Sequence, residues 1–275
     1  MANAPKPVTA KKESSGSSIF ASLSIVICIL VGFLLWKFVM GNSANFEGGD
    51  PVNGHPLPGN YFGMVYKGGY IVPLLMGMLL MVIVFSFERF FVINKATGKG
   101  NIDAFVKKVQ SFLGTGNIDA AIAECDKQEG SVANVIKSGL KKYKEMEVET
   151  NMDTEQKCLA IQKEIEEATA LEMPMLEQNL TVIATLVSVG TLMGLLGTVT
   201  GMIKAFAALS SAGSPDQATL ANGISEALIN TATGISTSAL AIIMYNLFTS
   251  KIDKLTYSID EAGFSIVQTY ASTHK

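Results

Sequence analysis

The sequence predicts an all-α membrane protein: a transmembrane helix bundle with four spans, one of them extra at the N-terminus, and long helices that extend into the cytoplasm. Three observations support this. Only 16% of the 275 residues are charged, against about 25% in soluble domains. Mean hydropathy is +0.34 although the apolar fraction is an ordinary 48%, so apolar residues must be clustered. Four segments supply the roughly 20 mostly apolar residues that a helix needs to cross a bilayer.

The rest of the composition argues against several functions. The net charge is −3, and no stripe of arginine and aromatic residues offers a surface for nucleic acid. The three cysteines are widely spaced without a CxxC motif, which indicates neither a disulfide framework nor a zinc site. No Ser/His/Asp arrangement is visible. We therefore expect a protein that is not an enzyme and that uses no metal, cofactor or nucleic acid.

The first predicted span covers residues 18–40, after a tail over 1–17. It could instead be a signal sequence, since lysines precede it, but its apolar run of about 20 residues exceeds the usual limit of about 15. Residues 41–68, rich in Gly, Pro and Asn, follow as an irregular loop outside the membrane.

The second predicted span covers residues 69–93 and closes on Glu88 and Arg89, which we interpret as an anchor at the membrane edge. Residues 94–178 then form a helical cytoplasmic domain, with amphipathic patterns that begin near Ile102, Asn117 and Ser131. From Asp153 a helix should continue into the third span, with a kink at Pro174.

The third span is predicted over 179–209 and the fourth over 223–250, joined by a short outer loop over 210–222 and followed by a cytoplasmic helix over 251–275. Lysines set the orientation. Residues 94–178 contain 11 of them, loop 41–68 contains one and loop 210–222 none. Both tails and the middle domain should therefore face the cytoplasm.

Hydroxyl side chains gather in the last two spans. In span three they recur at helical steps and share a face, and in span four they surround Gly234. A single Thr most often bonds its own helix backbone or a neighbouring helix, but matching rows on two helices favour a polar-lined pathway. Thr198 and Thr231 lie at similar depth and could face one lumen. The candidate pore-lining hydroxyls are Ser188, Thr191, Thr198, Thr231, Thr233 and Thr237.

Glycines in the same spans have spacings that let helices approach closely. The candidate helix-packing residues are Gly190, Gly194, Gly197, Gly201 and Gly234.

Glu226 is an acid inside an otherwise apolar span, which indicates a functional group. It could form a neutral ion pair with Lys204, or it could line a polar entrance as a further pore residue. A proton path needs a titratable group near its narrowest point, and spans three and four carry no Asp or Glu near mid-depth. If protons pass here, another chain should supply the carboxylate.

Two motifs then carry a family resemblance: GLLGTVTGM at 194–202 and GISEALINTATG at 223–234. In this order, on two spans, they resemble the signature of the MotA/TolQ/ExbB proton-channel family, with the ExbB branch nearest and TolQ next. The resemblance implies a homopentamer in the bacterial inner membrane whose last two spans line a pore. It assigns Thr198, Thr231 and Glu226 to that pore.

The resemblance also implies partners. An ExbD-like single-span subunit would sit in the pore and carry the proton-accepting Asp, and a TonB-like protein would receive the work for transport across the outer membrane. A TolQ-like or motility-type motor remains open, because partner chains set the output. A structural scaffold glued by its polar stripe is the third possibility. The extra first span, loop 41–68 and Lys204 depart from the ExbB pattern.

Overall fold

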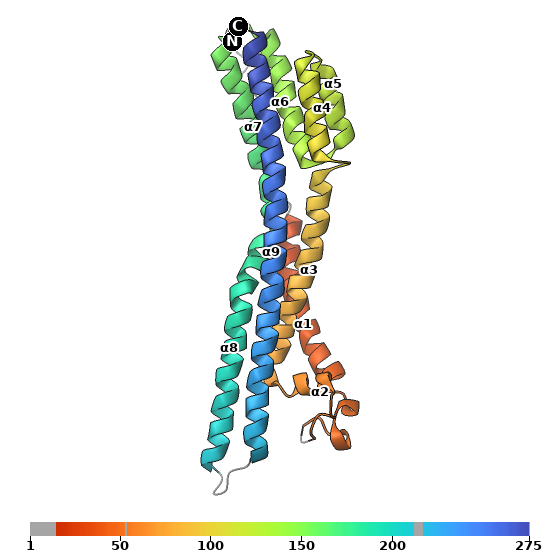
Figure 1. The fold of residues 1–275 in the computed structure, drawn as a ribbon, viewed down its shortest axis with the longest axis vertical. Coiled ribbons are helices and arrows are strands. Elements are labelled where there is room, and N and C mark those ends of the chain that lie inside the picture. Colours follow the sequence, from red (N-terminus) through yellow and green to blue (C-terminus); the bar gives the residue numbers. More distant parts are fainter. Residues whose placement is uncertain (1–14, 53, 212–216, 275) are drawn as a thin grey trace. The chain divides into compact units, whose positions relative to one another are not determined.

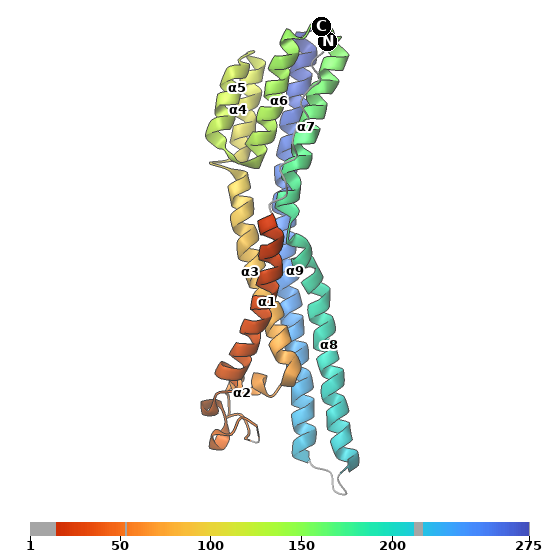
Figure 2. The same ribbon diagram turned by 180° about the vertical axis from the view of Figure 1, so that it is seen from behind.

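The computed structural model describes residues 15–52, 54–211 and 217–274. The regular elements among them are helices (Figure 1 and Figure 2), and one isolated bridge joins Phe46 to Pro56. Four helices in this part of the chain are long and apolar enough to cross a membrane. The predicted all-α membrane fold is therefore confirmed. Most of the predicted tail over 1–17 lies outside the described residues.

The first two long helices are joined by an ordered connection. Helix α1 (Ser15–Leu34) ends in a π-helical turn over Leu35–Met40. Two 3-10 turns follow, and then helix α2 (Tyr61–Tyr66), whose first turn is capped because the side-chain oxygen of Asn60 accepts from the Gly63 amide. A further 3-10 turn leads into α3 (Val72–Thr97). Loop 41–68 thus contains a helix that its Gly- and Pro-rich composition does not indicate.

The middle of the chain folds into four helices. These are α4 (Ile102–Gly114), α5 (Ile118–Gln128), α6 (Gly130–Val148) and α7 (Thr154–Glu177). Side-chain caps account for the starts of three of them: asparagine side chains cap α4 and α5, and Asp153 with Gln156 forms a capping box on α7.

The expectation of one helix running from Asp153 into the third span is wrong. Helix α7 ends at Glu177, and α8 (Leu180–Ser211) begins as a separate helix. Gln178 is extended and Asn179 has a left-handed φ of 62°, a conformation that Asn tolerates better than most residues. Pro174 itself lies inside α7, so the helix is interrupted after the proline, at Gln178 and Asn179, and not at the proline.

The last helix, α9, runs from Gln217 to Thr273 without interruption. It joins the predicted fourth span and the predicted C-terminal helix into one element. Since α8 extends to Ser211, the connection between α8 and α9 is shorter than the predicted loop 210–222, and its residues 212–216 lie outside the described part of the chain.

The contacts divide the chain into two compact units, Met1–Phe85 with Val182–Ile242, and Ser86–Thr181 with Ile243–Lys275. In the first unit, α1 packs closely on α3. A Cβ added to Gly32 would lie 2.7 Å from the backbone nitrogen of Gly77, so glycine permits this approach.

The second unit has a core built from α4, α5, α6, α7 and the C-terminal part of α9. Tyr270 of α9 is fully buried, and its hydroxyl donates to the Met146 carbonyl at 2.8 Å. Its ring packs edge-on against Tyr143 of α6 and stacks on His274, and Tyr143 and His274 also contact each other edge-on. Gly139 leaves room for Ile165 of α7.

Candidate functional site

Small residues bring the backbones of α8 and α9 together. A Cβ on Gly234 of α9 would lie 2.6 Å from the Gly190 carbonyl oxygen and 2.7 Å from the Gly194 Cα. Neither backbone atom can move aside, so the helix crossing depends on the absence of a side chain here. The five predicted helix-packing glycines are all buried in this crossing: Gly190, Gly194, Gly197, Gly201 and Gly234.

The hydroxyls of Thr198 and Thr231 hydrogen-bond each other directly across the crossing. Both also reach the Gly194 carbonyl oxygen, at 3.3 and 3.4 Å. Both side chains are half-buried within the single chain. The two threonines, predicted to lie at similar depth, are therefore in direct contact. Their side chains are partly exposed on one flank of the helix pair.

The other predicted hydroxyls differ in their surroundings. Thr191 is exposed on α8 and donates to Ser238 of α9 at 2.8 Å, on the same flank as Thr198. Ser188 is exposed. Thr233 and Thr237 donate to carbonyl oxygens one turn back on α9, and Thr237 is fully buried. The Thr237 side chain is therefore buried within this chain, and its hydroxyl bonds the backbone of its own helix, as a single threonine in a membrane helix most often does.

Glu226 lies on the opposite flank of the helix pair. It is five residues from Thr231, or about 140° around a helix of 3.6 residues per turn. Its carboxylate accepts from Lys204 of α8 at 2.6 Å, so the ion pair considered above is present. The carboxylate also contacts Gly69, at the start of the second predicted span. Thr231 and Glu226 therefore do not share one surface of this chain.

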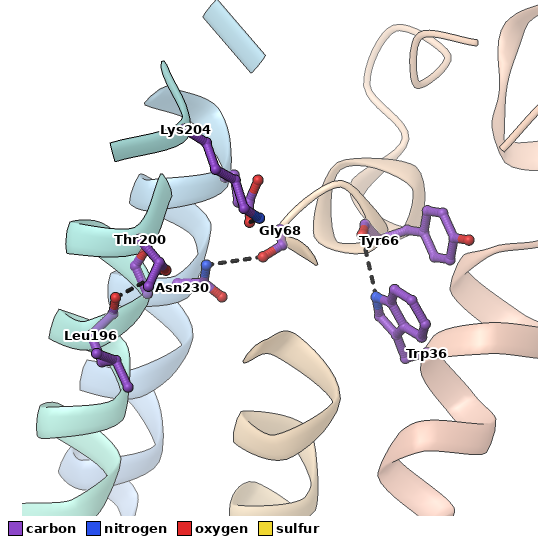
Figure 3. A network of polar contacts seen from close by, with 9 residues as sticks. Trp36, Tyr66, Gly68, Leu196, Thr200, Lys204 and Asn230 are labelled. Carbon is purple, nitrogen blue, oxygen red and sulfur yellow. Dashed lines mark hydrogen bonds and ion pairs between the residues drawn. The ribbon is translucent and has the colours of Figure 1, made fainter. Parts of the chain in front are cut away.

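Asn230, one of the polar residues around Gly234 in the fourth span, is not among the candidate site residues. It is fully buried, and its amide nitrogen donates to the Gly68 carbonyl oxygen at 2.9 Å (Figure 3). Its side-chain oxygen has no hydrogen-bond partner. Gly197 leaves the space that this side chain occupies. Asn230 therefore ties α9 to the residues that precede α3.

Arg89, which we interpret from the sequence as part of an anchor at the membrane edge together with Glu88, is a buried side chain. Its side chain is 2% exposed. The guanidinium pairs with Glu88 and donates to the carbonyl oxygens of Met175 and Leu176, at 3.0 and 3.1 Å. These carbonyls belong to the last turn of α7, which has no helical partners for them. Arg89 therefore caps the end of α7 from a buried position.

No group of three or more His, Cys, Asp or Glu side chains within the described residues could hold a metal ion. Burial of the Cys125 thiol raises its pKa to about 12, so it stays protonated near neutral pH.

Comparisons with known proteins match the segment that contains this helix pair. The model of the MotA/TolQ/ExbB proton channel family matches residues 127–261. The Tol-Pal system protein TolQ of Pseudomonas aeruginosa is 26% identical over 194 residues, which cover 70% of this chain and 84% of that protein.

Two ExbB-type relatives match over shorter stretches. The ExbB-like 3 protein of Synechocystis is 31% identical over 112 residues, or 40% of this chain and 53% of that protein. The biopolymer transport protein ExbB of Salmonella typhimurium is 28% identical over 85 residues, or 31% of this chain and 35% of that protein. The matched region thus spans about half of the first relative and about a third of the second. With its four membrane-length helices and a family match that includes Thr198 and Thr231, the chain belongs to the MotA/TolQ/ExbB proton channel family.

Proposed function

We propose that this chain is an ExbB-like proton-channel subunit of the bacterial inner membrane. With an ExbD-like partner, it would couple the proton motive force to TonB-dependent transport across the outer membrane. The observation that carries the proposal is the hydrogen bond between Thr198 and Thr231. It places a polar, half-exposed pair on one flank of two apolar helices, where a homopentamer of this chain would turn it toward a central pore.

The chain needs a partner for this task. Threonine hydroxyls hold and orient water or a protonated group, but they do not titrate near neutral pH. Between Glu226 and Asp253 helix α9 has no acidic residue, and α8 has none at all. A single-span partner with one intramembrane Asp would supply the missing proton acceptor.

A TolQ-type output is the second candidate. It is favoured by the extent of the match to the P. aeruginosa TolQ protein, which covers 84% of that protein, against 35% for the S. typhimurium ExbB protein. The pore chemistry would be the same in both cases, and only the chain that receives the work would differ.

Capture of the full-length chain from its host in mild detergent, with mass spectrometry of the bound chains, separates these outputs. A single-span chain with an intramembrane Asp and a TonB-like protein supports the ExbB reading. A TolA-like chain in place of the TonB-like protein would indicate a TolQ-type function. The absence of any single-span partner contradicts both.

Valine substitutions test the threonine pair. Thr198→Val and Thr231→Val keep the side-chain shape and remove the shared hydroxyls, so assembly should persist while energy transduction falls. Thr200→Val is the matched control, because the Thr200 hydroxyl bonds the carbonyls of Leu196 and Gly197 on its own helix (Figure 3 shows Thr200 beside Leu196). Wild-type transduction in both pair variants would refute the pore assignment.

A further inference from the structure

Residues 41–52 and 54–71, which we call the boundary segment, form an ordered structure. The Asn45 side chain donates to the carbonyls of Val39 and Met40, both at 2.9 Å. Asn60 in turn donates to the Asn45 side-chain oxygen at 3.0 Å and caps α2. Two asparagines thus fix the segment to the end of α1.

Aromatic packing fixes the other end. Trp36, the single tryptophan of the chain, stacks on Tyr66 with ring centroids 4.7 Å apart, and its ring N–H donates to the Tyr66 carbonyl (Figure 3). Phe46 packs edge-on against the same tyrosine. Lys67 donates to the Val52 carbonyl at 2.8 Å. The basic side chain of the segment is therefore held by backbone, and burial lowers its pKa.

The ordered segment exposes three large aromatic side chains, and Asn42, Ser43, Glu47 and His55 are exposed on it as well. Tyr70 is 82% exposed, Tyr61 77% and Phe62 54%. Tyr61 and Phe62 border a shallow hollow together with Leu57 and Pro58. Large aromatic side chains held outward on an ordered base are typical of a surface that contacts a membrane or a partner rather than of a loop in water.

The position of these side chains indicates what covers them. Both ribbon views show α2 beside the end of α1 and the start of α3, with the 3-10 turns farther out (Figure 1 and Figure 2). The exposed surface of α1, only 17% of whose apolar window is buried, continues to this level through Phe33 and Phe38. Tyr and Trp are enriched at this boundary between hydrocarbon and water.

We propose that the boundary segment lies in the headgroup region of the bilayer, with Tyr61, Phe62 and Tyr70 inserted among lipid headgroups and upper acyl chains. The argument is continuity: the surface that these residues extend is the lipid-facing surface of a membrane span. Their ring edges fill the apolar side of the boundary, while the Tyr hydroxyls reach water or headgroup phosphates. Glu47, exposed on the outer 3-10 turn, remains in water.

Depth measurement by electron paramagnetic resonance tests the proposal. Single spin-labelled cysteines would replace Tyr61, Phe62 and Tyr70, with Glu47→Cys as the matched control, in the full chain without its native cysteines. The protein would be placed in vesicles of phosphatidylethanolamine and phosphatidylglycerol. We expect high accessibility to oxygen and low accessibility to a water-soluble nickel chelate at the three aromatic positions, and the reverse at position 47.

Two results would overturn it. High nickel accessibility at the aromatic positions would place them in water. Low accessibility to both reagents would mean that protein covers them, either a second copy of this chain or a partner. Tyr61→Trp and Phe62→Trp in the otherwise native chain give a second measurement: brominated lipids should quench the added tryptophan more strongly than Trp36, which is only 8% exposed. Equal quenching would also contradict the proposal.

Discussion

Arg89 illustrates how one buried charge can organise a helix end. The guanidinium offers five donors in a planar fork, and here it serves the Glu88 carboxylate and two carbonyls of the last α7 turn. The negative end of the helix dipole adds to the attraction. Breaking a buried pair costs about 3–5 kcal/mol, because the remaining charge stays buried without its partner.

Arg89→Met should therefore destabilise the unit formed by residues 86–181 and 243–275 by about 3 kcal/mol, since it leaves two carbonyls and Glu88 without their donor. Arg89→Lys should recover only part of this, because a point-like ammonium cannot serve both carbonyls and the carboxylate. Thermal unfolding in detergent, followed by circular dichroism, measures both. A variant Arg89→Met as stable as wild type would show that water replaces the guanidinium.

The buried Cys125 thiol should make the free energy of unfolding depend on pH. It is 2% exposed, and burial raises its pKa from 9.0 to about 12. The folded chain then holds this proton more tightly than the unfolded chain, so stability should be full below pH 9 and fall as pH rises beyond it, by about 1.4 kcal/mol per unit. Denaturant unfolding at a series of pH values should show a steeper loss for wild type than for Cys125→Ala. Identical slopes would contradict this.

At the scale of elements, the crossing of α8 and α9 depends on Gly234. Gly234→Ala puts a methyl group against backbone atoms of α8 at 2.6 and 2.7 Å, so the helices must separate and the Thr198–Thr231 hydrogen bond should be lost. We expect a clearly lower melting temperature and lower transduction. Gly114→Ala is the control, because a Cβ there meets nothing within 4 Å; it should be neutral or stabilise α4 by up to about 1 kcal/mol. A wild-type melting temperature for Gly234→Ala would refute the close crossing.

A feature of the structure can be predicted from the sequence when the interactions that produce it join residues close together in the chain. The four apolar segments and the capping residues act within a few positions, so the membrane helices and most helix starts in the middle domain could be predicted. Asn230 and Arg89 could not, because their partners Gly68 and Leu176 lie 162 and 87 residues away, and no periodicity joins them. The break at Asn179 also escapes pattern analysis, since helical periodicity continues through it.

At the scale of the whole molecule, the polar groups of α8 and α9 divide between two flanks. Thr198, Thr231 and Thr191 lie on one, while Lys204 and Glu226 lie on the other with Gly69. The proposed pore would use the first flank. The second joins the helix pair to the start of α3, so its ion pair holds α8, α9 and the boundary segment in one arrangement.

Charge exchange distinguishes this positioning role from a role of Glu226 in proton uptake. Lys204 is 55% exposed and Glu226 15%, and such a partly solvated pair contributes about 1 kcal/mol or less, so variants should still reach the membrane. Lys204→Glu alone, or Glu226→Lys alone, places like charges together and should lower proton-driven uptake. The double exchange restores the attraction and should recover most of the proton-driven uptake, normalised to the amount of protein in the membrane.

The same exchange at Lys163 and Glu167, an exposed pair one turn apart on α7, is the control and should leave uptake unchanged. If the double exchange at 204 and 226 stays as inactive as the single variants, the carboxylate is needed at position 226 itself and Glu226 acts on the proton path.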